Sequence, residues 1–267
     1  MSDGTSGKAN SPVESRDRRS HRLPASIVHV HIPKTAGTSL REAFEAAYGD
    51  RLRVYPLRFE SEYGNIAYPE FNFFGGHIGF KVASGIGGDL ITVLRDPVDR
   101  FVSNYFFLRH QSISGEARNH KTFLAERYDL DQFVQIGDEP ILQKELRNRM
   151  TWQIAYSHRL ELRQELIDAG IDDGELVRLA LANLETFAVV GIQSDMPGLA
   201  EAIRRRYGVN LAIGRANVTG NRLAKRDISP ATLRHIERWV YLDEEFYRTW
   251  IGMRQAMRVS LGGEVSG

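Results

Sequence analysis

Six consecutive residues near the start of the chain combine one cation with small and hydroxyl-bearing side chains. They are Lys34, Thr35, Ala36, Gly37, Thr38 and Ser39. The preceding apolar run at 27–32 is rich in β-branched residues, which fits a buried parallel strand. In the segment that follows, at 40–48, apolar residues recur at helical spacing. A helix N-terminus attracts anions through its free N–H groups and its dipole. The stretch therefore predicts a phosphate-binding turn, with Thr38 or Ser39 as the helix cap. An ordinary strand-to-helix turn with a solvated Lys34 is the alternative.

An arginine and a serine occupy similar places in a second strand–turn–helix pattern. Arg95 follows an apolar, strand-like run at 89–94, and the Asp-Pro pair after it suits the start of a helix. Ser103 comes about two turns along that expected helix. A guanidinium can fork onto a phosphate, and a hydroxyl can add a further hydrogen bond. We therefore expect Arg95 and Ser103 to bind a second phosphate. The alternatives are a salt bridge from Arg95 to Asp96 or Asp99, and a solvated Ser103.

One histidine is well placed for proton transfer. His77 follows an aromatic, strand-like segment at 71–74 and two glycines. Open α/β sheets bind ligands beyond the carboxyl ends of their strands, and an imidazole titrates near neutral pH. We therefore expect His77 to accept a proton, with a purely structural histidine as the alternative. A polar loop at 217–222 either reaches a nucleotide through Asn221 and Arg222 or is a plain surface loop.

The composition of the whole chain limits what these residues can do. Its 267 residues suffice for one full core, and 42% hydrophobic and 26% charged residues are ordinary for a globular protein. A formal net charge of +1 gives no reason to expect binding to nucleic acid. Without cysteine there is no disulfide or thiolate metal site. His29 and His31 alternate on one strand face and fit packing better than metal binding, so we expect no metal.

Apolar strand-like runs alternate with helical segments along the chain. This predicts an α/β fold with a central, mostly parallel sheet flanked by helices. We expect a disordered tail at 1–25, one domain over 26–258 and a frayed end at 259–267. No apolar stretch approaches the roughly 20 residues that a membrane helix needs, and the first residues lack the apolar core of a secretory signal. We therefore expect a cytoplasmic protein without an integral membrane segment.

Further helical stretches are expected outside the two strand–turn–helix units, among them 175–185 and about 199–207. Amphipathic patterns at 121–136 and 139–158 each predict one helix, and a last long helix is expected from Ser229 through Trp250. Polar residues of the second pattern, Gln153 among them, either line a cleft for an acceptor or form a solvated outer face.

Three stretches together resemble the superfamily of sulfotransferases that use 3′-phosphoadenosine 5′-phosphosulfate (PAPS). The similarity is closest to the carbohydrate branch that includes heparan sulfate 2-O-sulfotransferase and its bacterial relatives. HIPKTAGTSL at 31–40 is similar to the 5′-phosphosulfate loop, and GGHIGF at 75–80 to the segment with that branch's catalytic histidine. VLRDPVDRFVSNYFFLRH at 93–110 is similar to the 3′-phosphate motif. The resemblance covers about residues 27–250.

The resemblance implies a P-loop-like nucleotide-binding fold and transfer of a sulfuryl group from PAPS to an acceptor hydroxyl. A saccharide is the acceptor that the branch implies, and no metal is required. The resemblance also implies that His77 is the base, that Lys34 stabilises the leaving oxygen, and that Arg95 and Ser103 bind the 3′-phosphate. Golgi members of the branch carry a membrane anchor and often disulfides. The sequence shows neither, which favours a cytoplasmic enzyme of the bacterial type.

Two other functions stay open at this stage. A P-loop-type kinase would need Mg²⁺ ligands and a lysine after the loop glycines, as in G-x-x-x-x-G-K-[ST]. Lys34 precedes Gly37, which fits poorly, although Asp96 could mimic a metal-binding aspartate. The other alternative is a nucleotide-binding or partner-binding module that keeps the fold without turnover, which the presence of both Lys34 and His77 argues against. The sequence indicates neither the identity of the acceptor nor the oligomeric state.

Overall fold

A five-stranded parallel sheet forms the centre of the protein and confirms the expected α/β class. The computed structural model describes residues 26–57, 71–137, 139–214, 223 and 225–262. The tail at 1–25 and the residues Asn221 and Arg222 lie outside this part. The strands are β1 (Ile27–Val30), β2 (Val54–Leu57), β3 (Phe73–Gly76), β4 (Asp89–Leu94) and β5 (Val189–Ile192), in the order β2-β3-β1-β4-β5. All four pairings between neighbouring strands are parallel.

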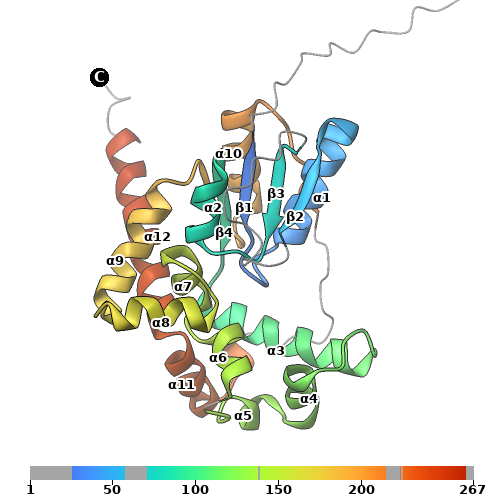
Figure 1. Ribbon diagram of the computed structural model, residues 1–267, viewed down its shortest axis with the longest axis vertical. Coiled ribbons are helices and arrows are strands. Elements are labelled where there is room, and N and C mark those ends of the chain that lie inside the picture. Colours follow the sequence, from blue (N-terminus) through green and yellow to red (C-terminus); the bar gives the residue numbers. More distant parts are fainter. Residues whose placement is uncertain (1–25, 58–70, 138, 215–222, 224, 263–267) are drawn as a thin grey trace, which may run out of the picture.

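Helices cover both faces of the sheet and extend beyond the carboxyl ends of its strands (Figure 1). They are α1 (Gly37–Tyr48), α2 (Phe80–Ile86), α3 (Pro97–Ile113), α4 (His120–Arg127), α5 (Leu130–Phe133), α6 (Pro140–Leu146), α7 (Arg149–Ala155), α8 (Leu160–Asp168), α9 (Asp173–Glu185), α10 (Met196–Tyr207), α11 (Pro230–Trp239) and α12 (Tyr241–Gly262). In the described part of the chain, no helix combines the length and the apolar character needed to cross a membrane. The expected end of the domain at residue 258 falls inside α12, which continues to Gly262.

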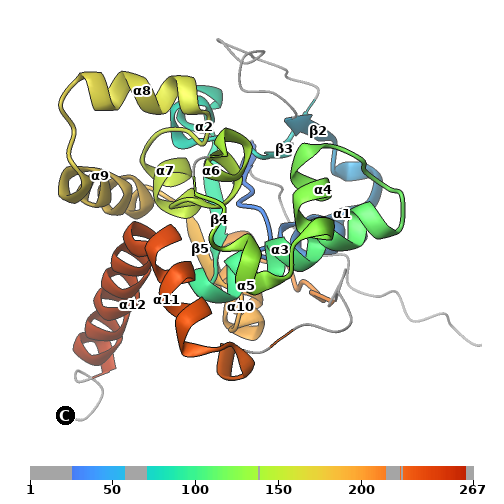
Figure 2. The same ribbon diagram turned by 90° about the horizontal axis from the view of Figure 1, so that it is seen from below.

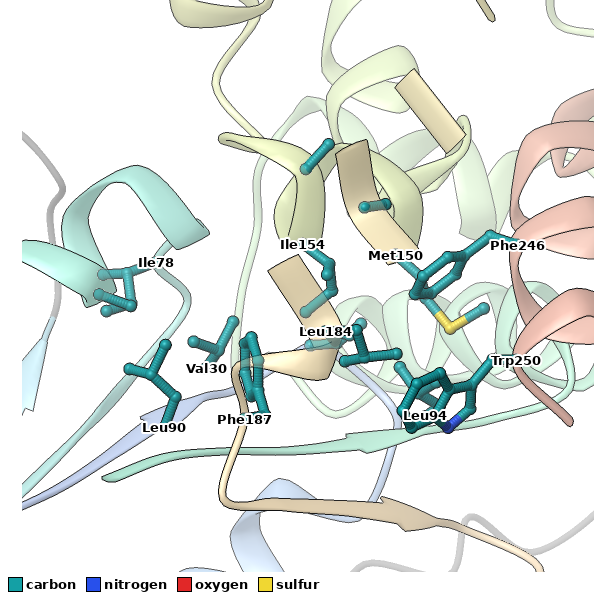
Figure 3. Packing of buried hydrophobic residues seen from close by; sticks show 14 of the residues in the cluster. Val30, Ile78, Leu90, Leu94, Met150, Ile154, Leu184, Phe187, Phe246 and Trp250 are labelled. Carbon is teal, nitrogen blue, oxygen red and sulfur yellow. The ribbon is translucent and has the colours of Figure 1, made fainter. Parts of the chain in front are cut away.

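Alternating side chains of the strands enter two different cores. On one face, Val28 and Val30 of β1 pack with apolar residues of α2, α7, α9 and α12. Figure 3 shows this core, with Met150 and Ile154 meeting Leu184, Phe246 and Trp250. On the other face, Ile27 packs with side chains of α1 and α10. Because β1 is buried on both faces, its sequence is apolar almost throughout, as is typical of a central parallel strand.

A third core belongs to helices alone. Side chains of α3, α4, α5, α6 and α11 pack together around Phe101, Phe133 and Trp239. Figure 2 views the molecule from the end where these helices lie. We call α3–α6 and α11 the helical cap. Since α3 begins three residues after β4 ends, the cap is attached directly to the carboxyl edge of the sheet.

The long helices expected from the sequence are broken in the structure. The pattern at 121–136 gives α4 and α5, and the pattern at 139–158 gives α6 and α7. The expected helix from Ser229 through Trp250 divides at Val240 into α11 and α12. Asn148 lies at two of these breaks. The helix α6 ends at Leu146 with extended backbone at Arg147, and Asn148 is the left-handed residue (φ 47°) that precedes α7 and whose polar groups bind the α11–α12 junction. Its N–H donates to the Trp239 carbonyl and its Oδ1 accepts from the Leu242 N–H, each at 3.0 Å.

A buried carboxylate holds the cap to the rest of the protein. Asp243, at the start of α12, accepts hydrogen bonds from the N–H and the hydroxyl of Thr151 on α7, both at 2.8 Å. It also lies 3.8 Å from the guanidinium of Arg100 on α3, and both side chains are fully buried. A buried ion pair of this kind is costly to break because either charge alone would be left desolvated. The network therefore fixes α3 and α7 relative to each other.

Candidate functional site

The strands β1 and β4 lie side by side at the point where the connections of the sheet change direction. The chain leaves β1 toward β2 on one side of the sheet and leaves β4 toward β5 on the other. Ligands of open α/β sheets bind outside the carboxyl ends of strands at such a switch point. The turns that follow β1 and β4 are the two turns that the sequence singles out. We call them the Lys34 turn (residues 31–36) and the Arg95 turn (residues 95–96).

A direct hydrogen bond joins the two turns. Arg95 Nη1 donates to the backbone carbonyl of Lys34 at 2.9 Å. Arg95 is only 8% exposed, and its Nε has no hydrogen-bond partner within the described residues. The alternative expected from the sequence, a salt bridge from Arg95 to Asp96, differs from the contacts that these two side chains make in the structure. The Asp96 carboxylate instead accepts from the Asp99 N–H and lies 3.7 Å from Lys225 Nζ.

The helix after the Lys34 turn begins earlier than the sequence indicates, and without a side-chain cap. It starts at Gly37 rather than Leu40, so the expectation that Thr38 or Ser39 caps it is wrong. The residue at the cap position is Ala36, and its backbone is left-handed (φ 73°). Its side chain makes no capping hydrogen bond to the first turn of the helix. The first turn also contains no acidic residue. Such a helix start offers backbone N–H groups to an external anion.

Backbone strain and one side-chain hydrogen bond shape the Lys34 turn. Lys34 and Ala36 both have positive φ (71° and 73°), a conformation that L-residues seldom adopt. Strained conformations of this kind persist where the surroundings impose them, and they cluster at functional sites. Between them, the buried Thr35 hydroxyl donates to the Ile32 carbonyl at 2.8 Å and closes the turn. The small residues of this stretch therefore form a compact loop over the end of β1.

The ammonium of Lys34 points toward the helix that follows the Arg95 turn. Its Nζ lies 3.7 Å from the centroid of the Phe107 ring on α3. Ser103 is buried one turn earlier on α3, at a spacing that places it on the same side of the helix as Phe107. The structure thus brings Lys34, Arg95 and Ser103 to one end of the sheet. Nothing in the sequence pointed to Phe107.

His77 lies beside the Lys34 turn, at the end of the strand next to β1. The pairing Val30↔Gly76 and the hydrogen bond from the His31 N–H to the Gly76 carbonyl (2.9 Å) set the register. The next residues along each strand are His31 and His77, and their ring centroids are 4.7 Å apart. His29 also stacks on His31, with 5.3 Å between the ring centroids and an interplanar angle of 16°. A row of three imidazoles therefore runs from the buried strand to its exposed end.

The surroundings of His77 keep its imidazole neutral at pH 7. His77 is exposed as a residue, but desolvation by the surrounding protein lowers the pKa of its imidazole to about 4. The positive charge of Arg149 is the second cause of this shift. Glu145 opposes this shift, while His158 and Lys121 add to it. A neutral imidazole is the form that can accept a proton.

A charged group from the helical cap faces His77. Burial tends to raise the pKa of Glu145, but Arg149 and Lys121 outweigh it and lower the pKa to about 2. Lys121 Nζ lies 2.7 Å from Glu145 Oε1. Glu145, Lys121 and Arg149 therefore surround the histidine with fixed charges, and the sequence patterns gave no reason to connect them with it.

Gln153 has a structural role, which fits neither of the two alternatives from the sequence, a place in an acceptor cleft or on a solvated outer face. It is completely buried, and its Nε2 donates to the carbonyls of His31 (3.1 Å) and Ile78 (2.7 Å). Its Oε1 accepts from Arg149 Nε at 2.9 Å. One amide thus ties the end of β1, the segment after His77 and α7 together, and it fixes the spacing between the two histidines.

In the described part of the chain, no group of three or more His, Cys, Asp or Glu side chains could hold a metal ion. Neither a scan against protein-family models nor a search of the curated proteins finds a match for this chain. What the site can do is therefore read from its own residues. They provide an uncapped helix start, two basic residues joined by a hydrogen bond from the Arg95 side chain to the Lys34 backbone carbonyl, and a neutral imidazole at the end of the neighbouring strand.

Proposed function

We propose that this chain is a sulfotransferase that moves a sulfuryl group from PAPS to an acceptor hydroxyl. The observation that carries the proposal is the 2.9 Å hydrogen bond from Arg95 Nη1 to the Lys34 carbonyl, which joins two turns suited to phosphate at one switch point. PAPS carries phosphate at both its 5′ and its 3′ position, so it requires two phosphate sites on one nucleotide. A donor such as ATP lacks the 3′-phosphate.

His77 acts as the base in this reaction. The acceptor oxygen forms a bond to sulfur while the bond between sulfur and the 5′-phosphate oxygen breaks. The hydroxyl proton passes to the neutral imidazole, and the products are a sulfate ester and 3′,5′-ADP. A base held in position in this way typically contributes about 10²- to 10⁴-fold to the rate.

Lys34 and the start of α1 stabilise the charge that develops on the leaving oxygen. An ammonium and backbone N–H groups fixed in place before the reaction are most effective where charge grows in the transition state. In the structure the ammonium rests on Phe107, a contact worth about 0.5–1 kcal/mol at an exposed site. This is small beside a charge-assisted contact with a phosphate, so the anion attracts the lysine away from the ring.

Arg95 and Ser103 are proposed to hold the 3′-phosphate. The buried Nε of Arg95 has no partner within the described residues, and buried donors normally have one. An anion at this position would satisfy it. The contact of Asn221 and Arg222 with the nucleotide stays a prediction from the sequence. A saccharide is proposed as the acceptor on the resemblance alone.

The two alternatives fit the site less well. A kinase would use Asp96 as a metal ligand, but that carboxylate caps α3 and lies near Lys225. Lys34 also precedes the loop glycine instead of following it. A binding module without turnover would not need a neutral histidine beside the phosphate turn.

Calorimetric titration with 3′,5′-ADP and, separately, with ATP and Mg²⁺ tests the proposal. We expect tight binding of 3′,5′-ADP and weak binding of ATP. A preference for ATP with Mg²⁺ would support the kinase alternative and contradict a 3′-phosphate site at Arg95.

The variant His77→Ala tests the chemical step. It should lose about 10²- to 10⁴-fold in turnover, measured with PAPS and a panel of hydroxyl acceptors, and keep the affinity for 3′,5′-ADP. His235→Ala, on α11 of the helical cap, is the control and should retain both. Unchanged turnover in His77→Ala would exclude this histidine as the base.

A further inference from the structure

His31 occupies the space between the start of α1 and His77. A Cβ atom built on Gly37 would lie 2.0 Å from His31 Cδ2 and 2.2 Å from Nε2, far closer than two such atoms can approach. The ring edge of His31 therefore lies directly against the first residue of α1, and only glycine fits there. On its other side the ring contacts His77, with 4.7 Å between the centroids.

The neighbours of His31 keep it uncharged when the site holds no anion. Burial contributes most to lowering its pKa well below the ordinary value, followed by the repulsion that a protonated His77 would exert. Cationic side chains from three further elements act in the same direction: Arg41 of α1, Arg149 of α7 and Lys34 of the Lys34 turn. His29, stacked beneath it on β1, also has its pKa lowered well below the ordinary value, by burial first and His31 second.

An anion bound at the start of α1 should raise the pKa of His31 more than that of His77. Its negative charge would lie against the Gly37 backbone and hence beside the His31 ring, with His77 one ring further away. A negative charge raises the pKa of a nearby imidazole. Two imidazolium rings 4.7 Å apart repel each other, and at an effective dielectric of about 20 a charge on one lowers the pKa of the other by about two and a half.

We propose that His31 is a positioning residue that takes up the proton which a bound phosphosulfate attracts, and so keeps the His77 imidazole neutral and able to accept the acceptor's proton. The inference rests on the function proposed above. His77 also faces Arg149 from α7, Glu145 from α6, Lys121 from α4 and His158. Because Glu145 favours a charged His77, it would act together with the anion to inactivate the base if His31 were absent.

The test follows the ring resonances of the histidines by NMR in the full chain, free and saturated with 3′,5′-ADP. In the wild type we expect the pKa of His31 to rise by one or more on binding, and that of His77 to rise less. His31→Phe keeps an aromatic ring over Gly37 but cannot take a proton, and His31→Gln is a second variant with a different shape. In both, the pKa of His77 should be higher than in the wild type in the complex, and nearly the same in the free protein.

The control is His29→Gln, which changes the neighbouring ring on the same strand and should leave the His77 pKa in the complex as in the wild type.

The pH dependence of kcat gives the second readout. A base works above its pKa, so the acid limb should move to higher pH in the His31 variants while the high-pH plateau is kept. A purely structural role would lower kcat equally at every pH.

The outcomes separate the two proposals. If 3′,5′-ADP binds and the pKa of His31 does not rise, or if the His31 variants shift His77 equally with and without the nucleotide, the inference about His31 is overturned and the sulfotransferase proposal stands. If 3′,5′-ADP does not bind to the wild type, both proposals are overturned.

Discussion

The Lys34 turn and the Arg95 turn begin their helices in opposite ways. The helix α1 starts at a left-handed alanine with no side-chain cap and no acid in its first turn. The helix α3 starts with a capping carboxylate from Asp96, Pro97 in its first turn and Asp99 behind them. Both turns end neighbouring parallel strands and both carry one basic residue. The difference lies in whether the backbone N–H groups of the helix are already satisfied.

Under the proposed function, this difference distinguishes two kinds of anion site. At α1 the backbone itself is available to a ligand, so a phosphate there can come close to the chain and to the reacting atoms. At α3 the first turn is capped and carries negative charge, so an anion can be held only by side chains, Arg95 and Ser103. We therefore expect changes in the Lys34 turn to affect turnover and changes at the Arg95 turn to affect the recognition of the nucleotide.

The largest effect should come from Lys34→Ala. Turnover should fall by about 10²- to 10³-fold, the cost usually found when one stabilising donor is removed from a developing oxyanion. Steady-state kinetics on PAPS measure this, with Lys225→Ala beside the Arg95 turn as the control, which should be close to the wild type. Near-normal turnover in Lys34→Ala would show that the lysine takes no part in the mechanism. It would also contradict the expectation that changes in the Lys34 turn affect turnover.

Thr38→Glu places a negative charge in the first turn of α1, where α3 already carries Asp99. At about 5 Å and an effective dielectric of about 20, the repulsion should weaken 3′,5′-ADP binding about 100-fold. The same charge should stabilise the helix by about 0.3–1 kcal/mol. Calorimetry and thermal melts should therefore move in opposite directions. The matched change Asp99→Asn should leave nucleotide affinity nearly unchanged, and a loss of binding there as large as in Thr38→Glu would contradict the comparison.

Arg95→Ala should weaken 3′,5′-ADP binding by about 10- to 100-fold, the value of a hydrogen bond to a charged group. Binding of 5′-AMP should barely change. Because Arg95 also donates to the Lys34 carbonyl, Ser103→Ala is the cleaner partner, with a smaller loss and the same selectivity. Equal losses for both nucleotides would argue against a 3′-phosphate site.

The smallest effect is expected from Asp96→Ala. Removing a helix cap should lower the free energy of unfolding by about 1 kcal/mol, measured by denaturant titration. Nucleotide affinity should change less than twofold, because the carboxylate serves the helix and not the ligand. Asp96→Asn keeps a capping oxygen and should restore most of the stability. A large loss of binding in Asp96→Ala would show that the capped turn does more than support α3.

Local patterns predicted the framework of the site well. The strand at 89–94 and the start of α3 at Pro97 agree with the structure to the residue. These features depend on side-chain alternation, caps and fixed φ values, all of which act between residues close together in the chain. The positions of Lys34, Arg95 and His77 at the carboxyl ends of their strands follow from the same patterns.

The breaks in the helices could not be predicted in this way. The pattern from Ser229 through Trp250 is helical by periodicity, but the helix divides at Val240, where Asn148, distant in the chain, hydrogen-bonds to Trp239 and Leu242 on either side. The unexpected start of α1 has a similar origin. The left-handed Ala36 lies in a turn that also makes a long-range contact, the hydrogen bond from Arg95 to the Lys34 carbonyl, which local sequence patterns do not indicate.

By itself, the sequence determined which residues could do chemistry and on which strand or turn each would lie. Only the tertiary structure decided which of them meet. The contact between His31 and His77 depends on the register of β1 against β3, and the bond between the two turns joins residues 61 positions apart. Register and long-range contacts are set by packing across the whole sheet, because a shift by one residue would turn each side chain to the opposite face. For that reason His77, which lies far from His29 and His31 along the chain, joins them in one row in the folded protein.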